Sequence, residues 1–300
     1  MKLICPCKDL FSENIIILLK KMFKCNFSNL SQNKFDKIFN NYEIVLLRFS
    51  HKLKFKKNNK IKFILSPTTG TNHIDKRYFA NKNIKIITLK NNYKFLKNVS
   101  ASTEFTIALI LLTLRKIKDI SKIKKREKFI GSEIYKKKVG IIGLGRIGNK
   151  ISKILSAFEA SIFTYDKENK KNRYSKNVSL NYILKNCDII TINIPYDYKN
   201  YNFFNREKLK KLKKNCVLIN TSRGEVVDEK FAVYLAKKKL IFYSTDVVKN
   251  EYQKSIFAIK NYNKIDNLIY TNHIAGLTNE SILKTDNFIF NKFKSIYEKL

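Results

Sequence analysis

Arg223, Glu251 and His273 each lie a few residues beyond an apolar run in the last third of the chain, and their side chains suit one kind of chemistry. Histidine can take up or release a proton near neutral pH, and a carboxylate within hydrogen-bonding distance would orient its ring. Arginine can hold a carboxylate through two parallel hydrogen bonds. We interpret the three as candidates for oxidising a secondary alcohol next to a carboxylate. His273 would be the base, Glu251 its partner and Arg223 the clamp on the carboxylate.

A glycine-rich turn upstream of these residues has the spacing of a dinucleotide-binding motif. Gly143, Gly145 and Gly148 follow a predicted strand over 139–142 and open a predicted helix over 146–158. The first glycine permits a sharp turn, the second lets the backbone approach a pyrophosphate, and the third lets the helix pack closely on the strand. The unpaired N–H groups at the start of the helix would then bind the phosphates.

Asp166 follows the next predicted strand, 18 residues after the last of these glycines. A carboxylate at this position can accept hydrogen bonds from the ribose hydroxyls of NAD, and it would repel the 2′-phosphate of NADP. Lys167 beside it weakens this preference without reversing it. The motif therefore predicts NAD as the cofactor.

Each catalytic candidate also has an ordinary structural interpretation. Arg223 resembles a surface base that caps a helix, Glu251 a solvated loop acid, and His273 a hydrogen-bonded core histidine. The chain has only 8 arginines and 3 histidines in 300 residues. Because the three candidates follow a dinucleotide motif, their joint occurrence favours catalysis over three unrelated structural roles.

Short apolar runs alternate with helix-length segments along the whole chain. This rhythm is typical of an α/β fold with parallel strands, in which ligands bind at the carboxyl ends of the strands. Helices are predicted at Phe105–Lys118 (buried), Arg146–Phe158, Glu229–Leu240 and an amphipathic segment ending at Leu300. Strands are predicted at Leu3–Cys5, Ile15–Leu19, Ile44–Leu47, Ile61–Leu65, Ile84–Leu89, Val139–Ile142, Ser161–Tyr165, Asp188–Ile194, Cys216–Asn220, Phe242–Val248 and Leu268–Thr271.

The chain carries 61 lysines and arginines against 24 acids, a formal net charge of +37, which suggests a nucleic-acid-binding protein as an alternative. The excess is spread along the sequence, and 53 of the bases are lysines, although arginine is the better partner for phosphates and base edges. We interpret the charge as compositional bias on solvated surfaces. It predicts attraction of small anionic substrates and no specific nucleic-acid partner.

Five scattered cysteines without a Cys-x-x-Cys pair favour neither a disulfide framework nor a metal site, and they fit a cytoplasmic location. The longest apolar run, Phe105–Leu114, has 10 residues, about half the length of a bilayer span. Asp9 interrupts the N-terminus before any apolar stretch of signal-peptide length. Neither a membrane-spanning nor an exported protein is expected.

From about Arg48 to the C-terminus, the order of motifs resembles the D-2-hydroxyacid dehydrogenase family, on the side nearest D-3-phosphoglycerate dehydrogenase. The matching segments are Thr69–Asp75, Ser102–Leu109, the glycine motif, Asn220–Asp228, Asp246–Glu251 and Thr271–Gly276.

The resemblance assigns roles to particular residues. It implies that Arg223, Glu251 and His273 are catalytic, and that the loop at Thr69 and Gly70 offers backbone amides to a substrate carboxylate. Arg48 matches a basic position that can face a substrate phosphate, and Asp246 would hold the nicotinamide amide. The residues expected to contact NAD are Thr69, Gly143, Gly145, Arg146, Ile147, Gly148, Asp166, Ile194, Thr221, Arg223, Asp246 and His273.

The fold implied by the resemblance consists of two Rossmann-like, doubly wound parallel-sheet domains. A flavodoxin-like substrate domain would span 1–100 and be completed by 277–300, around an NAD-binding domain at 101–276. Family members are usually dimers joined through their cofactor domains. We therefore expect a homodimer, in which the apolar helix from Phe105 gains a burial partner.

The implied activity is hydride transfer between nicotinamide and a small D-2-hydroxy acid or 2-keto acid, such as 3-phosphoglycerate, hydroxypyruvate or glyoxylate. The alternative is a catalytically idle NAD-binding scaffold or sensor of the same fold, against which the intact Arg–Glu–His trio argues. No regulatory domain follows residue 300, so feedback by an amino acid bound in such a domain is not expected.

Two departures from the family pattern affect the catalytic loops. Tyr252 replaces the proline expected after the glutamate, and Asn272 replaces the proline expected before the histidine. Both changes free the backbone, which predicts looser geometry at these loops.

Overall fold

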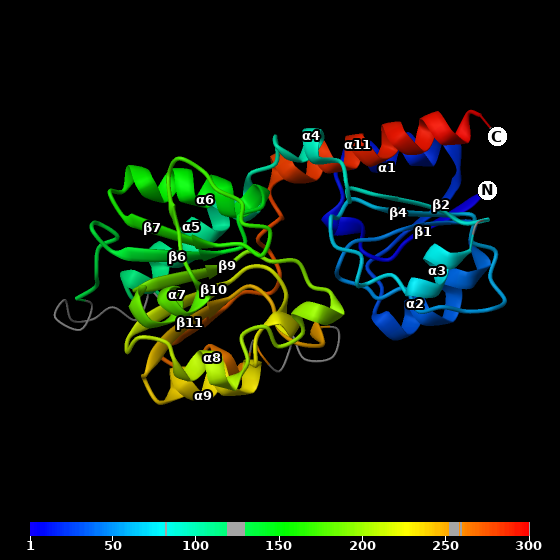
Figure 1. Cartoon of the computed structure of the whole chain (residues 1–300). Helices are drawn as coiled ribbons and strands as arrows, with labels where there is room; N and C mark the ends of the chain where they lie inside the picture. The colour runs from blue at the N-terminus through cyan, green and yellow to red at the C-terminus, as the bar shows by residue number, and fades with distance from the viewer. Residues whose placement is uncertain (82, 119–129, 252–257, 259, 300) are drawn as a thin grey trace. The chain divides into compact units, whose positions relative to one another are not determined.

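The computed structural model describes residues 1–81, 83–118, 130–251, 258 and 260–299. It divides the chain into two compact units, one formed by Met1–Val99 with Leu277–Leu300 and the other by Ser100–Gly276. Each unit contains one β-sheet with helices on both faces (Figure 1). The predicted α/β class, with two doubly wound sheets, is confirmed.

The first unit is built on a five-stranded sheet in the order β2-β1-β3-β4-β5, which is the flavodoxin-like order. Every strand pair in it is parallel, so the carboxyl ends of the strands share one edge. The strands are β1 (Lys2–Cys5), β2 (Lys24–Phe27), β3 (Ile44–Leu46), β4 (Phe63–Ser66) and β5 (Lys85–Thr88).

Successive residues of these strands enter two cores, one on each face of the sheet. Leu3 and Leu65 pack on the side of α1 and α11, whereas Ile4 and Ile64 pack on the side of α2 and α3. The C-terminal segment belongs to this unit because Phe293 of α11 is fully buried in the first of these cores. The helices are α1 (Glu13–Met22), α2 (Gln32–Ile38), α3 (Lys76–Ala80), α4 (Tyr93–Leu96) and α11 (Asn279–Tyr297).

The second unit is built on a seven-stranded parallel sheet in the order β12-β11-β10-β9-β6-β7-β8. The order reverses between β6 and β9, the switch point at which a Rossmann sheet binds its dinucleotide. The strands are β6 (Lys138–Ile142), β7 (Ser161–Tyr165), β8 (Lys176–Asn177), β9 (Ile189–Ile192), β10 (Cys216–Asn220), β11 (Ile241–Thr245) and β12 (Leu268–Tyr270).

Helices cover both faces of this sheet as well. Val139 and Ile219 pack on the side of α5 and α6, and Ile190 and Leu218 pack on the side of α7, α8 and α9. The helices are α5 (Ala101–Leu114), α6 (Arg146–Ala157), α7 (Leu180–Asn186), α8 (Arg206–Lys210) and α9 (Glu229–Lys237).

One predicted strand is wrong. Ile15–Leu19 forms part of α1, where Ile15 and Leu19 are buried one helical turn apart while Ile17 between them is 52% exposed. An unbroken apolar run fits a buried strand and a helix equally well, because it lacks the alternation that would separate them. The prediction also misses β2, a partly buried edge strand with the sequence KCNF and no apolar run.

The apolar stretch Tyr93–Leu114 meets the length and composition of a membrane span. It comprises α4 in the first unit and α5 in the second, separated by Lys97–Ser100. Leu109 and Ile110 of α5 are fully buried in the core of the second unit. Packing within that core accounts for the buried face of α5, whereas Leu111 and Leu112 on the same helix are 37% and 36% exposed.

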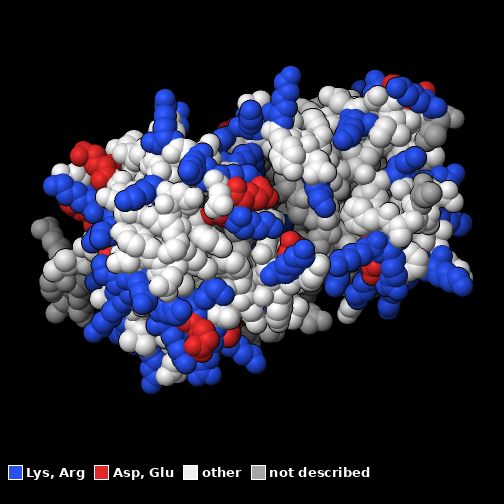
Figure 2. Space-filling model, in the orientation of Figure 1, with Lys and Arg blue, Asp and Glu red and all other residues white. Residues whose placement is uncertain are grey.

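Lysine and arginine side chains are dispersed over the face in Figure 2, with few acidic side chains between them. This distribution agrees with the even spread of basic residues along the sequence.

Candidate active site

The candidate residues of the second unit lie at one edge of its sheet, because each follows the carboxyl end of a strand. Gly143, Asp166 and Asp246 come directly after β6, β7 and β11. Arg223 and His273 lie three residues beyond β10 and β12. Since all these strands are parallel, the topology gathers the candidates at the same edge.

His273 and Glu251 form a direct pair. Nδ1 of His273 lies 2.8 Å from Oε2 of Glu251, and the two side chains are 19% and 18% exposed. An ionised carboxylate can only accept a hydrogen bond, so Nδ1 donates and Nε2 of the neutral ring is left as the basic nitrogen. The pair therefore presents the imidazole in the tautomer that a general base requires.

Asp246 holds the loop that carries His273. Its carboxylate accepts hydrogen bonds from Oγ1 of Thr271 at 2.6 Å and from the backbone N–H groups of Ile274 and Ala275, both at 2.9 Å. Its backbone carbonyl accepts the N–H of His273 at 2.7 Å. His273 has φ of 54°, a left-handed conformation that costs energy for residues other than glycine. These bonds to Asp246 therefore stabilise the backbone that aims the imidazole.

The Asp246 carboxyl is itself fully buried. Burial raises its pKa, although the charge of His273 and the three donors favour the ionised form. Three donors from the His273 loop occupy the carboxylate, so of its roughly four acceptor sites about one remains for a nicotinamide amide.

Of the two positions at which the sequence departs from the family pattern, the structure describes Asn272 only. Asn272 is exposed, and its side-chain oxygen accepts a hydrogen bond from the Tyr270 hydroxyl at 3.0 Å. This bond supplies a local anchor where a proline was expected. Tyr252 lies outside the described residues.

The Arg223 loop is held by Asn220 at the end of β10. The side-chain amide of Asn220 donates to the carbonyl of Arg223 at 3.0 Å, and its oxygen accepts from the N–H and hydroxyl of Ser222. Gly224 lies so close to the chain after β11 that an added Cβ would stand 2.0 Å from the carbonyl carbon of Val248. The loop that carries Arg223 therefore packs against the segment that leads to Glu251.

The glycine turn has the shape that a dinucleotide needs. Gly143 has φ of 90°, and a Cβ on Gly148 would stand 2.1 Å from the Gly143 carbonyl oxygen, so α6 packs tightly on the turn. A Cβ on Gly145 would meet no atom within 4 Å. Gly145 is also the N-cap of α6 and supplies no capping side chain. The open space and the uncapped helix amides fit the pyrophosphate of a dinucleotide.

Asp166 is attached to this turn. Its carboxylate accepts hydrogen bonds from the backbone N–H of Leu144 at 2.7 Å and of Glu168 at 2.9 Å. The half-buried carboxylate thus lies beside the glycine turn, as a ribose-binding group would.

The remaining NAD-contact candidates lie around the same edge. Arg146 and Ile147 are half-buried in the first turn of α6, and burial lowers the pKa of Arg146. Ile194 follows β9, and its Cγ2 would stand 2.9 Å from a Cβ on Gly143. Oγ1 of Thr221 lies 2.8 Å from Oγ1 of Thr106 in α5.

Thr69 and Gly70, the candidates for binding a substrate carboxylate, follow β4 in the first unit. Thr69 is exposed and Gly70 is half-buried. The Thr68 hydroxyl donates to the carbonyl of Gly70 at 2.9 Å, and the Thr68 N–H donates to the carbonyl of Ser66 at 2.8 Å. These bonds fix the backbone of the loop.

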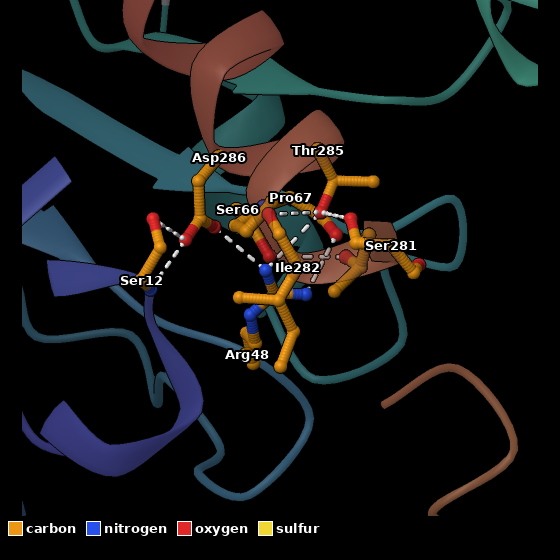
Figure 3. A network of polar contacts seen from close by, with 9 residues as sticks. Ser12, Arg48, Ser66, Pro67, Ser281, Ile282, Thr285 and Asp286 are labelled. Carbon is orange, nitrogen blue, oxygen red and sulfur yellow. Dashed lines mark hydrogen bonds and ion pairs between the residues drawn. The ribbon is translucent and has the colours of Figure 1, made fainter. Parts of the chain in front are cut away.

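Arg48, the candidate for facing a phosphate, lies in a buried network of the first unit (Figure 3). Nη2 of its guanidinium lies 2.6 Å from Oδ1 of Asp286 and 3.2 Å from Oγ1 of Thr285, and Nη1 donates to the carbonyl of Pro67 at 3.3 Å. The other Asp286 oxygen accepts from the N–H and hydroxyl of Ser12. A phosphate would therefore have to compete with Asp286 for this guanidinium.

Sequence reasoning missed Asp286, which ties α11 to the ends of β3 and β4. Burial raises the pKa of Asp286, although the Arg48 charge and the Ser12 donors favour its ionised form. A signal was present in the sequence, since Asp286 precedes Ile289 and Phe293 by three and seven residues on the apolar face of the closing helix. An acid on an apolar helix face requires a buried partner.

Comparison with known proteins identifies the family to which this chain belongs. The sequence model described as "D-isomer specific 2-hydroxyacid dehydrogenase, NAD binding domain" matches residues 107–275, more than half of the chain. The chain belongs to the D-isomer specific 2-hydroxyacid dehydrogenase family. It is therefore an NAD-dependent oxidoreductase acting on a CH–OH group, and the glycine turn lies inside its NAD-binding domain.

Individual relatives in this family differ in substrate. The chain is 33% identical to erythronate-4-phosphate dehydrogenase of Wigglesworthia glossinidia brevipalpis over 95% of its own length and 71% of the relative's. It is 28% identical to D-3-phosphoglycerate dehydrogenase of Archaeoglobus fulgidus over 83% of its length and 48% of the relative's. The chain thus spans about half the length of that second relative.

Solved structures share the family's fold. The D-lactate dehydrogenase of Aquifex aeolicus, complexed with NAD and lactic acid, matches with a TM-score of 0.82 at 22% identity, covering 100% of this chain and 96% of that one. An acyclic imino acid reductase in complex with NADPH and D-Arg matches with a TM-score of 0.79 at 20% identity, covering 100% of this chain and 98% of that one. The two-unit architecture is therefore shared by enzymes that use different substrates.

Proposed function

We propose that this chain interconverts a small, anionic D-2-hydroxy acid and its 2-keto acid, with Arg223, Glu251 and His273 as the catalytic residues. The observation that carries the proposal is the 2.8 Å contact between His273 and Glu251 at the carboxyl edge of the NAD-binding sheet. A scaffold that only bound NAD would not require this pair.

In the oxidative direction, Nε2 of His273 takes the proton of the substrate hydroxyl, and the negative charge of Glu251 stabilises the imidazolium that results. Bound NAD supplies the hydride acceptor. Arg223 holds the substrate carboxylate and, in the reverse direction, polarises the carbonyl oxygen. His273 then returns its proton to that oxygen.

The glycine turn and α6 hold the pyrophosphate, and Asp166 binds the ribose hydroxyls in this proposal. The residues proposed to complete the NAD contacts are Thr69, Arg146, Ile147, Ile194, Thr221 and Asp246. The backbone of Thr69 and Gly70 would bind the substrate carboxylate.

The substrate we propose carries a phosphate. The relative from Wigglesworthia, which matches along 95% of the chain, acts on a phosphorylated sugar acid, as does the relative from Archaeoglobus. The net charge of +37 would attract such an anion. We further propose that the enzyme is a cytoplasmic homodimer.

A substrate screen tests this function. NADH oxidation is followed with glyoxylate, hydroxypyruvate and phosphohydroxypyruvate, and NAD reduction with 4-phosphoerythronate and 3-phosphoglycerate. We expect kcat/KM to be at least tenfold higher for a phosphorylated acid than for its unphosphorylated counterpart. Absence of turnover with every acid, despite NADH binding, would favour the idle scaffold instead.

A further inference from the structure

We propose that Glu229 is a positioning residue that keeps Glu251 within hydrogen-bonding distance of His273. This inference rests on the function proposed above. Glu229 is the first residue of α9 and is only 5% exposed. A carboxylate this buried is costly unless donors surround it, so its partners indicate its role.

Both oxygens of Glu229 have a donor, and one of these donors lies two residues before Glu251. Oε2 accepts the backbone N–H of Lys249 at 2.5 Å, and Oε1 accepts the hydroxyl of Tyr262 at 2.5 Å. Burial raises the pKa of Tyr262, and the hydrogen bond to Glu229 raises it further, so this phenol remains a donor. The carboxylate thus joins α9 to the chain two residues before Glu251 and to Tyr262 further along it.

The anchored amide lies two residues before Glu251. Asn250 between them lies in a turn and has φ of 53°, a left-handed conformation. Nζ of Lys249 lies 2.5 Å from Oδ1 of Asn202, which adds a second anchor to the same residue. On the other side, Gly224 lies against Val248 and Lys249, leaving no room for a Cβ. The direction in which the chain enters Glu251 is therefore fixed by Lys249.

Glu229 is not needed to cap its own helix. The side chain of Asp228 already accepts the N–H of Phe231 and caps α9. Glu229 instead accepts one bond from the segment that leads into Glu251 and one from Tyr262. This division of roles between neighbouring acids supports a positioning function for Glu229.

A double-mutant cycle tests the proposal. Glu229→Gln retains one acceptor oxygen but removes the charge that binds two donors. We expect it to lower kcat about tenfold while KM for NADH changes less than twofold, because the glycine turn and Asp166, which hold the pyrophosphate and ribose in the proposed function, lie on other loops. Glu251→Gln should lower kcat further, and adding Glu229→Gln to it should change kcat less than twofold. If Glu229→Gln lowered kcat by the same factor in the wild type and in Glu251→Gln, the proposal would be overturned, because the free-energy effects of substitutions at independent sites are additive.

Two further measurements keep the test decisive. Tyr262→Phe removes one donor with little change in volume, and it should lower kcat two- to fivefold; it replaces Glu229→Gln in the cycle if that variant does not fold. Crystal structures of wild type and variant give a reading that does not depend on activity. We expect the distance from Glu251 Oε2 to His273 Nδ1 to exceed 3.5 Å in the variant, and an unchanged distance would overturn the proposal.

The control and the wild type separate this inference from the proposed function. Glu207→Gln on α8, whose side chain is 72% exposed, should leave kcat and KM unchanged. A wild type that turns over no 2-keto acid would contradict the proposed function. An active wild type with an equally active Glu229→Gln variant would contradict only the role of Glu229.

Discussion

His273 Nδ1 lies 2.8 Å from Glu251 Oε2, although the two residues are 22 positions apart in the chain. They reach each other because β11 and β12 are neighbouring parallel strands whose carboxyl ends share one edge. The loop after β12 bends back in a left-handed turn at His273 itself, held by Asp246. The contact is therefore set by strand order and by one buried carboxylate.

Replacing His273 should remove turnover without removing the cofactor. His273→Asn is preferred to alanine because asparagine tolerates the positive φ of this position. We expect kcat to fall by about 10²- to 10⁴-fold, because the proton acceptor is lost. NADH affinity, measured by fluorescence titration, should change less than threefold. Glu207→Gln, on an exposed side chain of α8, serves as the control; retained turnover in His273→Asn would exclude the assigned role.

Gly145 and Gly148 should respond in opposite ways to alanine. A methyl group at Gly145 meets no protein atom within 4 Å, so Gly145→Ala should keep the wild-type stability to within about 0.5 kcal/mol. The same group would occupy the space proposed for the pyrophosphate, and NADH affinity should fall at least tenfold.

Gly148→Ala, in contrast, would place its methyl 2.1 Å from a backbone oxygen and should destabilise the unit by about 1–3 kcal/mol. Urea unfolding and NADH titration of both variants check the contrast. An unchanged NADH affinity in Gly145→Ala would show that the pyrophosphate binds elsewhere.

Asp166 should set the preference for NAD over NADP. Asp166→Asn retains an oxygen for the Leu144 amide and removes the charge that would repel a 2′-phosphate. We expect the ratio of kcat/KM for NADH to that for NADPH to fall at least tenfold. Glu168→Gln makes the same charge change two residues away on an exposed side chain and should leave the ratio unchanged. A wild type without any preference would contradict the prediction.

The glycine turn and the strands of the second unit could be predicted from the sequence because the patterns that mark them are local. The glycine spacing, the strands Ser161–Tyr165 and Cys216–Asn220 and the start of α6 at Arg146 agree with the structure. A parallel sheet buried on both faces leaves apolar runs that mark its strands directly.

The partners of buried polar groups could not be read in the same way. Nothing near Arg48 in the sequence indicates that its carboxylate partner is Asp286, 238 residues later. Likewise, the three donors that occupy Asp246 come from a loop whose conformation depends on the positive φ of His273. Such pairings follow from tertiary packing, which no local pattern encodes.

Breaking the Arg48–Asp286 pair should destabilise the first unit. The side chains are 8% and 0% exposed, so Arg48→Met would leave a buried carboxylate without its cation. We expect the free energy of unfolding to fall by about 3–5 kcal/mol, and the double variant Arg48→Met/Asp286→Leu to recover much of it. Lys54→Met, which breaks an ion pair whose lysine is 57% exposed, should cost about 1 kcal/mol or less. A loss in Arg48→Met no larger than this control would indicate that the pair carries little stability.

Asp188 should make the stability of the second unit depend on acid pH. It accepts the backbone N–H of Lys138 at 2.9 Å and lies 2.5 Å from Nζ of Lys213, joining β6, β9 and the segment before β10. Burial opposes its ionisation, but these two donors outweigh burial and lower its pKa. A carboxyl group whose pKa is lower in the folded state stabilises that state at pH values above its unfolded pKa of about 3.9. That stabilisation is lost as the pH falls through the folded value.

Asp188→Asn should therefore lower the free energy of unfolding by about 1 kcal/mol at pH 7, mostly because the bond from the Lys138 amide loses its charged acceptor, since the Lys213 side chain is 49% exposed and its ion pair contributes little. The difference from wild type should shrink as the pH is lowered from 5 toward 3, because protonation removes the same charge in the wild type. Urea unfolding across this range measures it, with Glu207→Gln as the exposed control. A difference that stays constant with pH would mean that Asp188 acts through its shape and not through its charge.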